Sequence, residues 1–313
     1  MSNASVPSNA SGPPMRVAVI GLGSIGGVAA GLLQAAGRHA VTACVRTPVE
    51  RLVVECDDGP VDVALTTLTD PAKATPVDWV LLCTKAYDTA SAGPWLQRLC
   101  GAATQVAVLQ NGLGHADRVA SWVSRDRVVP VIVYYNGERL AADRVRLRTA
   151  PGHDLAVAND AAGRAFAQLL DGTRLRVLLS DDFSRLTWRK LLLNAVANPI
   201  TALTLQRQGV LRRADVHALS LDLLAEAIAV ARADGVPLED DEAQRAMQTL
   251  FSFAPDFGTS MYFDRLAGRP CEIDALNGAI VAAGARLGVA TPINRTLVTL
   301  LRAINDAAKD GTA

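Results

Sequence analysis

Residues 16–26 read Arg16-Val17-Ala18-Val19-Ile20-Gly21-Leu22-Gly23-Ser24-Ile25-Gly26, an apolar strand followed directly by a glycine-rich turn. The turn has the spacing G-x-G-x-x-G, and the residues after it predict a helix as far as Ala36. In this context Gly21 makes the tight turn, Gly23 admits a pyrophosphate, and Gly26 lets the helix pack against the strand. The helix N-terminus adds free amides and a positive partial charge. The stretch predicts a dinucleotide-binding site, with a plain tight turn as the alternative.

Short apolar runs and helical stretches alternate from Met15 to about Ser180. Strands are predicted at 40–45, 79–83, 105–109, 128–135, 145–148 and 175–179, and helices at 88–100 and 163–170. This alternation predicts an α/β domain with a largely parallel sheet, a doubly wound domain of the Rossmann type, over residues 15–181.

Strand signals almost vanish after about Asp182. Helices are predicted at 184–206, 212–234, 239–253, 260–267, 272–287 and 293–309, with glycine and proline between them. Residues 182–313 are therefore predicted to form an all-α domain that carries the substrate site. Residues 1–14 contain no charged side chain and lack the pattern of a signal peptide, which predicts a disordered extension or a cloning remnant.

The bulk composition excludes several classes of protein. The formal net charge of +0 and the 4% of aromatic residues argue against nucleic acid as a partner. No apolar run reaches the roughly 18 residues of a membrane span. The five cysteines form no Cys-x-x-Cys pair, which favours reduced thiols and a cytoplasmic location, and the four scattered histidines predict no metal site. The oligomeric state is not defined by the sequence, which permits a homodimer.

The end of the second predicted strand distinguishes between the two nicotinamide dinucleotides. An NAD site places an acidic residue about twenty positions after the glycines, where it binds the ribose 2′-hydroxyl. Arg46 occupies this place here. A guanidinium matches a 2′-phosphate in charge and geometry, so NADP(H) is the predicted cofactor. The alternative is an arginine that merely faces solvent.

A polar stripe lies on the apolar helix predicted after Asp182. Lys190, Asn194 and Asn198 follow one another at steps of four residues, and each step turns a helix by about 400°, so the three share one face. An ammonium and two carboxamides among leucines, valine and alanines predict a cleft for a small anionic, oxygen-rich molecule. A solvent-exposed polar face is the alternative.

Sequence blocks in both halves resemble the ketopantoate reductase family (2-dehydropantoate 2-reductases). The blocks are GLGSIG at 21–26, CTKAY at 83–87, QNGLG at 110–114, WRKLLLNAVANPITAL at 188–203, SMYFDRLAGRPCEID at 260–274 and GVATP at 288–292. Each block alone is weak, but the ordered set, spread from Met15 to the last helix, is specific.

The resemblance implies NADPH-dependent reduction of a 2-oxo acid to a 2-hydroxy acid, in the supply of pantothenate and coenzyme A. Lys190 resembles the catalytic lysine that protonates the carbonyl oxygen, and burial would lower its pKa toward working pH. Glu272 resembles a cleft carboxylate that contacts cofactor and substrate and could tune Lys190; stabilisation of a helix first turn is the alternative. The other matches are Gly21, Leu22, Gly23, Ser24, Ile25, Gly26, Arg46 and Lys85 for the cofactor, Asn194, Asn198 and Ser260 for the substrate, and Asn111 for both.

Two of these matches have a simple structural alternative, and two positions depart from the family. Lys85 could be a solvated lysine after a strand, and Asn111 could belong to an ordinary turn. Gln208 stands where relatives present an asparagine, and Phe257-Gly258-Thr259 precedes Ser260 without a second serine. These departures affect the shape of the substrate pocket. A related reductase or dehydrogenase of another bulky 2-oxo or 2-hydroxy acid is therefore the second hypothesis, and a non-catalytic NADP-binding sensor the third.

Overall fold

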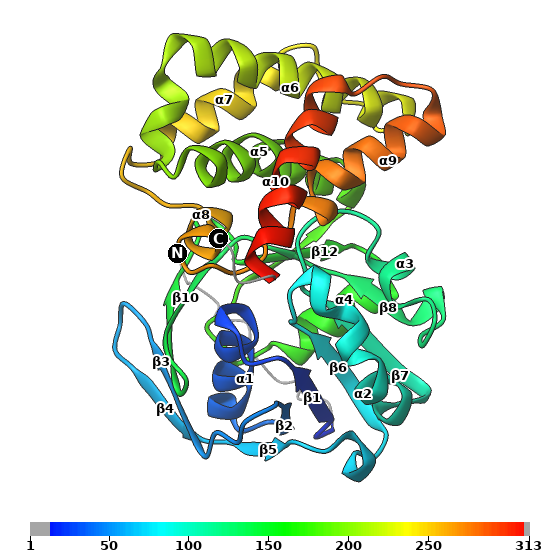
Figure 1. The fold of residues 1–313 in the computed structure, drawn as a ribbon. Coiled ribbons are helices and arrows are strands. Elements are labelled where there is room, and N and C mark those ends of the chain that lie inside the picture. The colour runs from blue at the N-terminus through cyan, green and yellow to red at the C-terminus, as the bar shows by residue number, and fades with distance from the viewer. Residues whose placement is uncertain (1–12, 310–313) are drawn as a thin grey trace, which may run out of the picture.

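A parallel sheet forms the centre of the N-terminal half in the computed structural model, which describes residues 13–309 (Figure 1). Its strand order is β5-β2-β1-β6-β7-β8, and all neighbouring strands run parallel. The strands are β1 (Arg16–Ile20), β2 (Ala40–Cys44), β5 (Thr66–Leu68), β6 (Val77–Leu82), β7 (Cys100–Val108) and β8 (Val128–Pro130). The order reverses between β1 and β6, and ligands of such sheets bind at the carboxyl ends of the strands at this point.

Both faces of the sheet are covered because the strands are apolar on both sides. Val17 and Val19 face a core that includes α1 (Ser24–Ala36) and α4 (Ala161–Leu169). Ala18 and Ile20 face a second core that includes α2 (Gly93–Leu99) and α3 (His115–Val119). The short 3-10 helices here are η1 (Pro71–Lys73), η2 (Ala86–Ala92) and η3 (Arg125–Arg127). The predicted helix at 88–100 thus divides into η2 and α2.

A second sheet, which the sequence did not predict as a unit, packs against α1. Its order is β10-β11-β3-β4, from β3 (Arg51–Glu55), β4 (Val61–Ala64), β10 (Asn136–Ala141) and β11 (Arg144–Arg148). Gly31 lets this sheet approach, since a Cβ there would lie 2.4 Å from Val54 Cγ2. A third, smaller sheet holds β9 (Ile132–Val133), β12 (Leu155–Ala158) and β13 (Val177–Ser180). The single strand predicted at 128–135 is therefore wrong: it divides at Val131 into strands of two sheets.

The chain is helical after Asp182, which caps the next helix by accepting a hydrogen bond from the Arg185 amide. The elements are α5 (Phe183–Thr204), η4 (Gln208–Arg212), α6 (Ala214–Ala233), α7 (Glu242–Ser252), α8 (Ser260–Leu266), η5 (Ile273–Ala275), α9 (Asn277–Leu287) and α10 (Pro292–Lys309). The helix predicted from 272 begins only at Asn277, because Leu276 has non-helical backbone angles.

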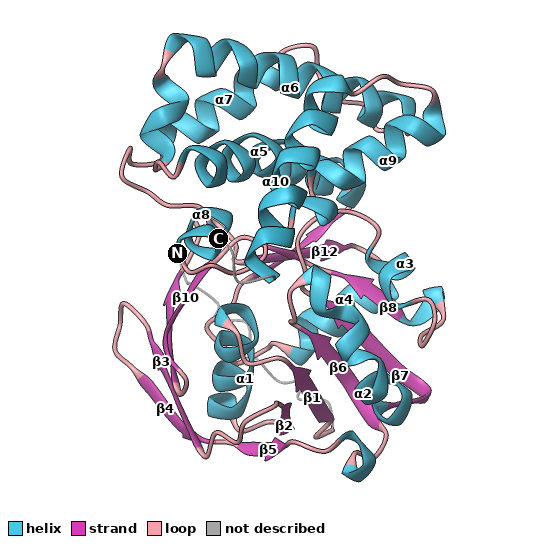
Figure 2. Ribbon diagram, in the orientation of Figure 1, coloured by secondary structure: helices cyan, strands magenta, loops and turns pink. Residues whose placement is uncertain are grey.

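Helices α5, α6, α7 and α9 gather at one end of the molecule and the strands, with α1, α2, α3 and α4, at the other, while α8 lies between the two ends (Figure 2). The predicted class, a Rossmann-type domain followed by helices, is confirmed. The domain boundary at 181/182 stays a prediction, and the predicted tail at 1–14 falls outside the described residues except for its last two. Among the helices of residues 13–309, none has the length and apolarity needed to cross a membrane.

Candidate active site

The glycine turn has the geometry that the sequence predicted. Gly21 has φ +92°, and its amide donates to Cys44 O at 3.1 Å. A Cβ on Gly26 would lie 1.9 Å from Gly21 O, so only glycine fits there. A Cβ on Gly23 would meet no heavy atom within 4 Å, so the space in front of the α1 N-terminus is open. A pyrophosphate fits this space and would accept hydrogen bonds from the free amides. Leu22 is buried, and Ser24 and Ile25 are partly buried at the start of the helix.

Arg46 lies just beyond β2, the strand next to β1. Its side chain is exposed and makes no hydrogen bond or ion pair with the residues that the structure describes. The guanidinium is therefore free to bind a ligand.

A cluster of charges around two buried carboxylates joins the two halves of the chain. Lys85 Nζ donates to Asp264 Oδ2 at 2.6 Å and to Glu272 Oε2 at 3.2 Å. The other Glu272 oxygen accepts from the Ala86 amide at 2.8 Å. Asp264 and Glu272 are both almost fully buried, and Arg269 completes the cluster through Asp264. We call Lys85, Asp264, Arg269 and Glu272 the interdomain charge cluster.

The interdomain charge cluster fixes the protonation of Lys85. Burial lowers the pKa of this lysine, but the nearby carboxylates of Glu272 and Asp264 outweigh that effect and raise it above its ordinary value. Glu272 precedes η5 and bonds to Lys85 and Ala86. No hydrogen bond joins Glu272 to Lys190 in the described part of the chain, and burial is the cause of the shift in the pKa of Lys190, so tuning by Glu272 stays a prediction.

The 110–114 turn carries Asn111 to the edge of the helical half. Gln110 is buried and donates to Thr84 Oγ1 at 3.1 Å, while Arg118 donates to Gln110 Oε1 at 3.0 Å and to Asn111 O at 2.8 Å. A Cβ on Gly112, which has φ +93°, would lie 1.8 Å from Ala275 O. The turn is thus held from inside, and Asn111 keeps a partly buried side chain that bonds to none of residues 13–307.

The polar stripe on α5 lies on the other side of the same region. Lys190 is half-buried; its Nζ donates to Val133 O and lies 5.0 Å from the centre of the Tyr134 ring. Burial lowers the pKa of Lys190 to about 8. Asn194 is half-buried and Asn198 nearly fully buried, and neither amide bonds to another described side chain or backbone group.

The segment 133–135 connects this stripe to the glycine turn. Val133 O accepts from Lys190, and two residues later Tyr135 donates its hydroxyl to Ile25 O at 2.9 Å. Thr84, two residues after the end of β6, also lies beside the glycine turn, because a Cβ on Gly21 would lie 3.1 Å from its methyl group. The glycine turn, Lys85, the 110–114 turn and the α5 stripe therefore border one region.

The side chains of Ser260 and Gln208 make no hydrogen bond with the described part of the chain, although residues beside them are anchored. Ser260 is the exposed first residue of α8, and the preceding Thr259 bonds to Thr201 of α5 at 2.7 Å. Gln208 is buried, and its Oε1 has no hydrogen-bond partner within residues 13–307.

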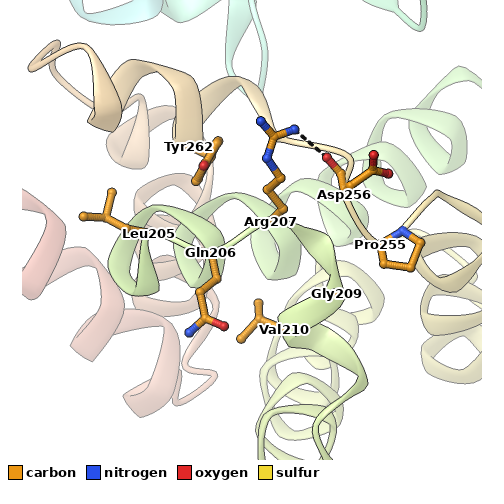
Figure 3. A pocket seen from close by; sticks show the side chains of 8 residues that line it. All are labelled: Leu205, Gln206, Arg207, Gly209, Val210, Pro255, Asp256 and Tyr262. Carbon is orange, nitrogen blue, oxygen red and sulfur yellow. Dashed lines mark hydrogen bonds between the residues drawn. The ribbon is translucent and has the colours of Figure 1, made fainter.

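An open pocket of about 460 Å³ lies beyond the end of α5 (Figure 3). Arg207 crosses it toward Asp256, whose backbone oxygen accepts its hydrogen bond at 2.6 Å. The lining residues are Leu205, Gln206, Arg207, Gly209, Val210, Pro255, Asp256 and Tyr262. None of the predicted site residues lines this pocket, so it does not mark the site described above.

Sequence reasoning missed several groups that build the site. Asp264 stands four residues after Ser260 in a family block, yet only the structure pairs it with Lys85. Gln110 and Arg118 hold the 110–114 turn, and the sequence around Gln110 offered a signal in the QNGLG block. Tyr134 contacts Lys190 without any motif around it.

Comparison with known proteins places the chain among a group of enzymes. Residues 17–158 match the family model "Ketopantoate reductase PanE/ApbA", and residues 182–305 match "Ketopantoate reductase PanE/ApbA C terminal". The 2-dehydropantoate 2-reductase of Mycobacterium tuberculosis is 40% identical over 93% of this chain and 98% of its own length. That of Caulobacter vibrioides is 38% identical over 92% and 98%.

Solved structures share the fold over nearly the whole chain. A PanE/ApbA family ketopantoate reductase from Ralstonia eutropha has a TM-score of 0.85 at 32% identity, covering 94% of this chain and all of its own. A D-mandelate dehydrogenase solved with NADH and anilino(oxo)acetate has a TM-score of 0.84 at 23% identity, covering 94% and 100%, which shows the fold alone. Together with the matched models, these relatives show that the chain belongs to the ketopantoate reductase PanE/ApbA family of oxidoreductases.

Proposed function

We propose that this protein reduces 2-dehydropantoate to pantoate with NADPH, as a step in the supply of pantothenate and coenzyme A. The observation that carries the proposal is the position of Lys190. It is a half-buried ammonium, without a carboxylate partner among the described residues, that contacts the same short segment as the glycine turn. The relatives at 38% and 40% identity bear the name of this activity, which supports the choice of substrate.

In this mechanism the chain's own residues hold the substrate and supply a proton. The amides of Asn194 and Asn198 and the hydroxyl of Ser260 bind the carboxylate and hydroxyl of the 2-oxo acid, and Asn111 orients its carbonyl. With its pyrophosphate at the glycine turn, NADPH would supply a hydride to the carbonyl carbon. Lys190 Nζ then gives a proton to the carbonyl oxygen, which becomes the 2-hydroxyl, and the neutral amine regains a proton from water. Glu272 contacts the cofactor and the substrate, as the family resemblance implies, and also holds Lys85 at the cofactor edge.

The choice of NADP(H) over NAD(H) rests on Arg46, which supports a 2′-phosphate by charge and fork geometry. Arg46→Asp should raise the KM for NADPH about a hundredfold, because it replaces a charge-assisted hydrogen bond with a like-charge contact. The KM for NADH should change by less than about threefold. Equal losses with the two cofactors would remove Arg46 from the cofactor site.

The direct test is oxidation of NADPH by the purified protein with 2-dehydropantoate and a panel of branched and aromatic 2-oxo acids. Turnover that prefers 2-dehydropantoate supports the proposal. Turnover only with another acid would keep the role of Lys190 but transfer the function to the alternative hypothesis. Without turnover of any acid, the catalytic proposal fails.

Two further expectations stay predictions. A homodimer is permitted by the sequence; a ketopantoate reductase from Staphylococcus aureus that shares the fold at 24% identity is described as dimeric. Sedimentation velocity of the purified chain measures its mass in solution.

The cytoplasmic location, expected from the dispersed cysteines, is checked by fractionation of cells that express the protein.

A further inference from the structure

The helix that carries the substrate stripe is interrupted by a proline. Pro199 lies inside α5, immediately after Asn198. Proline has no amide hydrogen, so it cannot bond to the carbonyl four residues earlier. That carbonyl belongs to Ala195, which lies between Asn194 and Asn198 and is almost fully buried. A buried carbonyl without a donor is costly, and the turn around it would shift or admit water.

A side chain from another helix supplies the missing donor. Asn277, the first residue of α9, donates from Nδ2 to Ala195 O at 2.9 Å. Its second Nδ2 hydrogen goes to Asn294 Oδ1, also at 2.9 Å. Asn277 is fully buried, and its Oδ1 has no partner in the described part of the chain, so the amide acts as a double donor.

The orientation of this amide is fixed by a chain of polar groups. A backbone carbonyl only accepts, so Asn277 must turn its nitrogen to Ala195. Asn294 therefore presents its oxygen to Asn277 and its nitrogen to Glu226 Oε2, at 2.8 Å. The Glu226 carboxylate in turn accepts from the Ile293 and Asn294 amides at the start of α10. Each donor in this series faces an acceptor, and the hydrogen bonds join α5, α6, α9 and α10.

We propose that Asn277 is a positioning residue: it replaces the hydrogen bond that Pro199 removes from α5 and so holds Asn194 and Asn198 in place for the substrate. This inference rests on the proposed function, in which those two amides bind the 2-oxo acid. Lys190 lies more than one helical turn before Ala195, so a loss of Asn277 affects substrate binding more than proton transfer.

The test is a double-mutant cycle between Asn277 and Pro199. Asn277→Leu removes both donors at similar volume, and Pro199→Ala restores an amide hydrogen that can bond to Ala195 O. With Pro199 present, Asn277→Leu should raise the KM for 2-dehydropantoate about tenfold, with kcat changed by less than about threefold. With Ala at 199, the same substitution should raise KM by less than about threefold. The cycle compares ratios, so any effect of Pro199→Ala alone cancels.

Two controls separate positioning from general destabilisation. Leu250→Ala removes a buried side chain of α7 and lowers stability, but it should leave the KM for the 2-oxo acid unchanged. Thermal unfolding of the four proteins of the cycle reports the coupling between positions 199 and 277 without any substrate. If Asn277→Leu does not fold, Asn277→Ser, which keeps one shorter donor, takes its place.

The outcomes distinguish the two proposals. A wild-type protein that reduces none of the 2-oxo acids would overturn the proposed function. An active wild type in which Asn277→Leu raises KM by the same factor with Pro or Ala at 199 would overturn the positioning role alone. An equal rise of the KM for the 2-oxo acid in Leu250→Ala would also overturn it, because a merely structural effect would then explain the result.

Discussion

The side chains of Lys85 and Lys190 are both partly buried, yet their surroundings shift their pKa values in opposite directions. Lys85 lies between the carboxylates of Asp264 and Glu272, which outweigh burial and raise its pKa. Lys190 has a backbone carbonyl and an aromatic ring as neighbours, and burial lowers its pKa to about 8. A lysine held between two carboxylates stays charged, whereas one without a carboxylate can give up its proton near neutral pH.

The same comparison suggests what a bound substrate would do. The carboxylate of a 2-oxo acid on Asn194 and Asn198 would bring an anion toward Lys190, as Asp264 does for Lys85. The anion would keep Lys190 protonated until the developing alkoxide takes the proton. On the proposed function, the substrate would therefore supply the negative charge near Lys190, whereas Asp264 and Glu272 already supply it near Lys85.

Loss of Lys190 should have the largest effect. Lys190→Ala should lower kcat by a factor of about 10² to 10⁴, the usual contribution of a positioned general acid. NADPH affinity, measured by its fluorescence on binding, should change by less than about threefold, since the glycine turn lies on other elements. Lys190→Arg keeps the charge but cannot release a proton at neutral pH, and it should remain impaired. Near-normal turnover of either variant would remove the general-acid role.

Substitution of Glu272 or of Asp264 removes one of the two carboxylates that bind Lys85 in the interdomain charge cluster. Glu272→Gln removes one charged partner of Lys85 and should lower kcat/KM about ten- to a hundredfold, from the loss of a charge-assisted contact at the cofactor edge. Asp264→Asn also removes a charged partner of Lys85, but Asp264 has no proposed contact with a ligand, so its loss should be smaller. Equal losses in steady-state kinetics would reduce Glu272 to an anchor for Lys85.

The glycine turn and the interdomain charge cluster also differ in how far sequence predicts them. The turn is local: strand, glycines and helix follow within Arg16–Ala36, and the structure shows a steric reason for Gly21 and for Gly26. In the cluster, Lys85 meets Asp264 and Glu272 across 179 and 187 residues. Such pairs depend on how two folded halves meet, so only family resemblance singled out Lys85 and Glu272, and nothing predicted their contact.

The sheet β10-β11-β3-β4 was not predicted as a unit for a different reason. Strands β3 and β4 span only Arg51–Glu55 and Val61–Ala64, and β10 is mostly exposed and polar. Half-buried strands of this kind carry a weak apolar signal, because only the residues that face α1 must be hydrophobic. The helices α5, α6 and α10 are long and periodic, and their predicted bounds agree with the structure to within two residues.

The pH dependence of the reaction tests whether the substrate carboxylate raises the pKa of Lys190, as Asp264 and Glu272 raise that of Lys85. With NADPH saturating, kcat/KM should be flat below pH 8 and fall about tenfold per pH unit above it, because the deprotonated Lys190 has no proton to give. The alkaline midpoint of kcat should lie at higher pH than that of kcat/KM, since the substrate carboxylate raises the pKa of Lys190 in the complex. Coincident midpoints would mean that the substrate anion does not reach Lys190.

Tyr134 should have the smallest effect. Its ring lies 5.0 Å from Lys190 Nζ, and such a cation–π contact stabilises the charged lysine by about 0.5–1 kcal/mol. Tyr134→Leu removes the ring but keeps the site apolar, so the alkaline midpoint of kcat/KM should move to lower pH by about half a pH unit. Tyr134→Phe keeps the ring and should leave the midpoint in place. A shift of equal size in both variants would assign the effect to the hydroxyl. An unchanged midpoint in Tyr134→Leu would mean that the ring does not stabilise the charged form of Lys190.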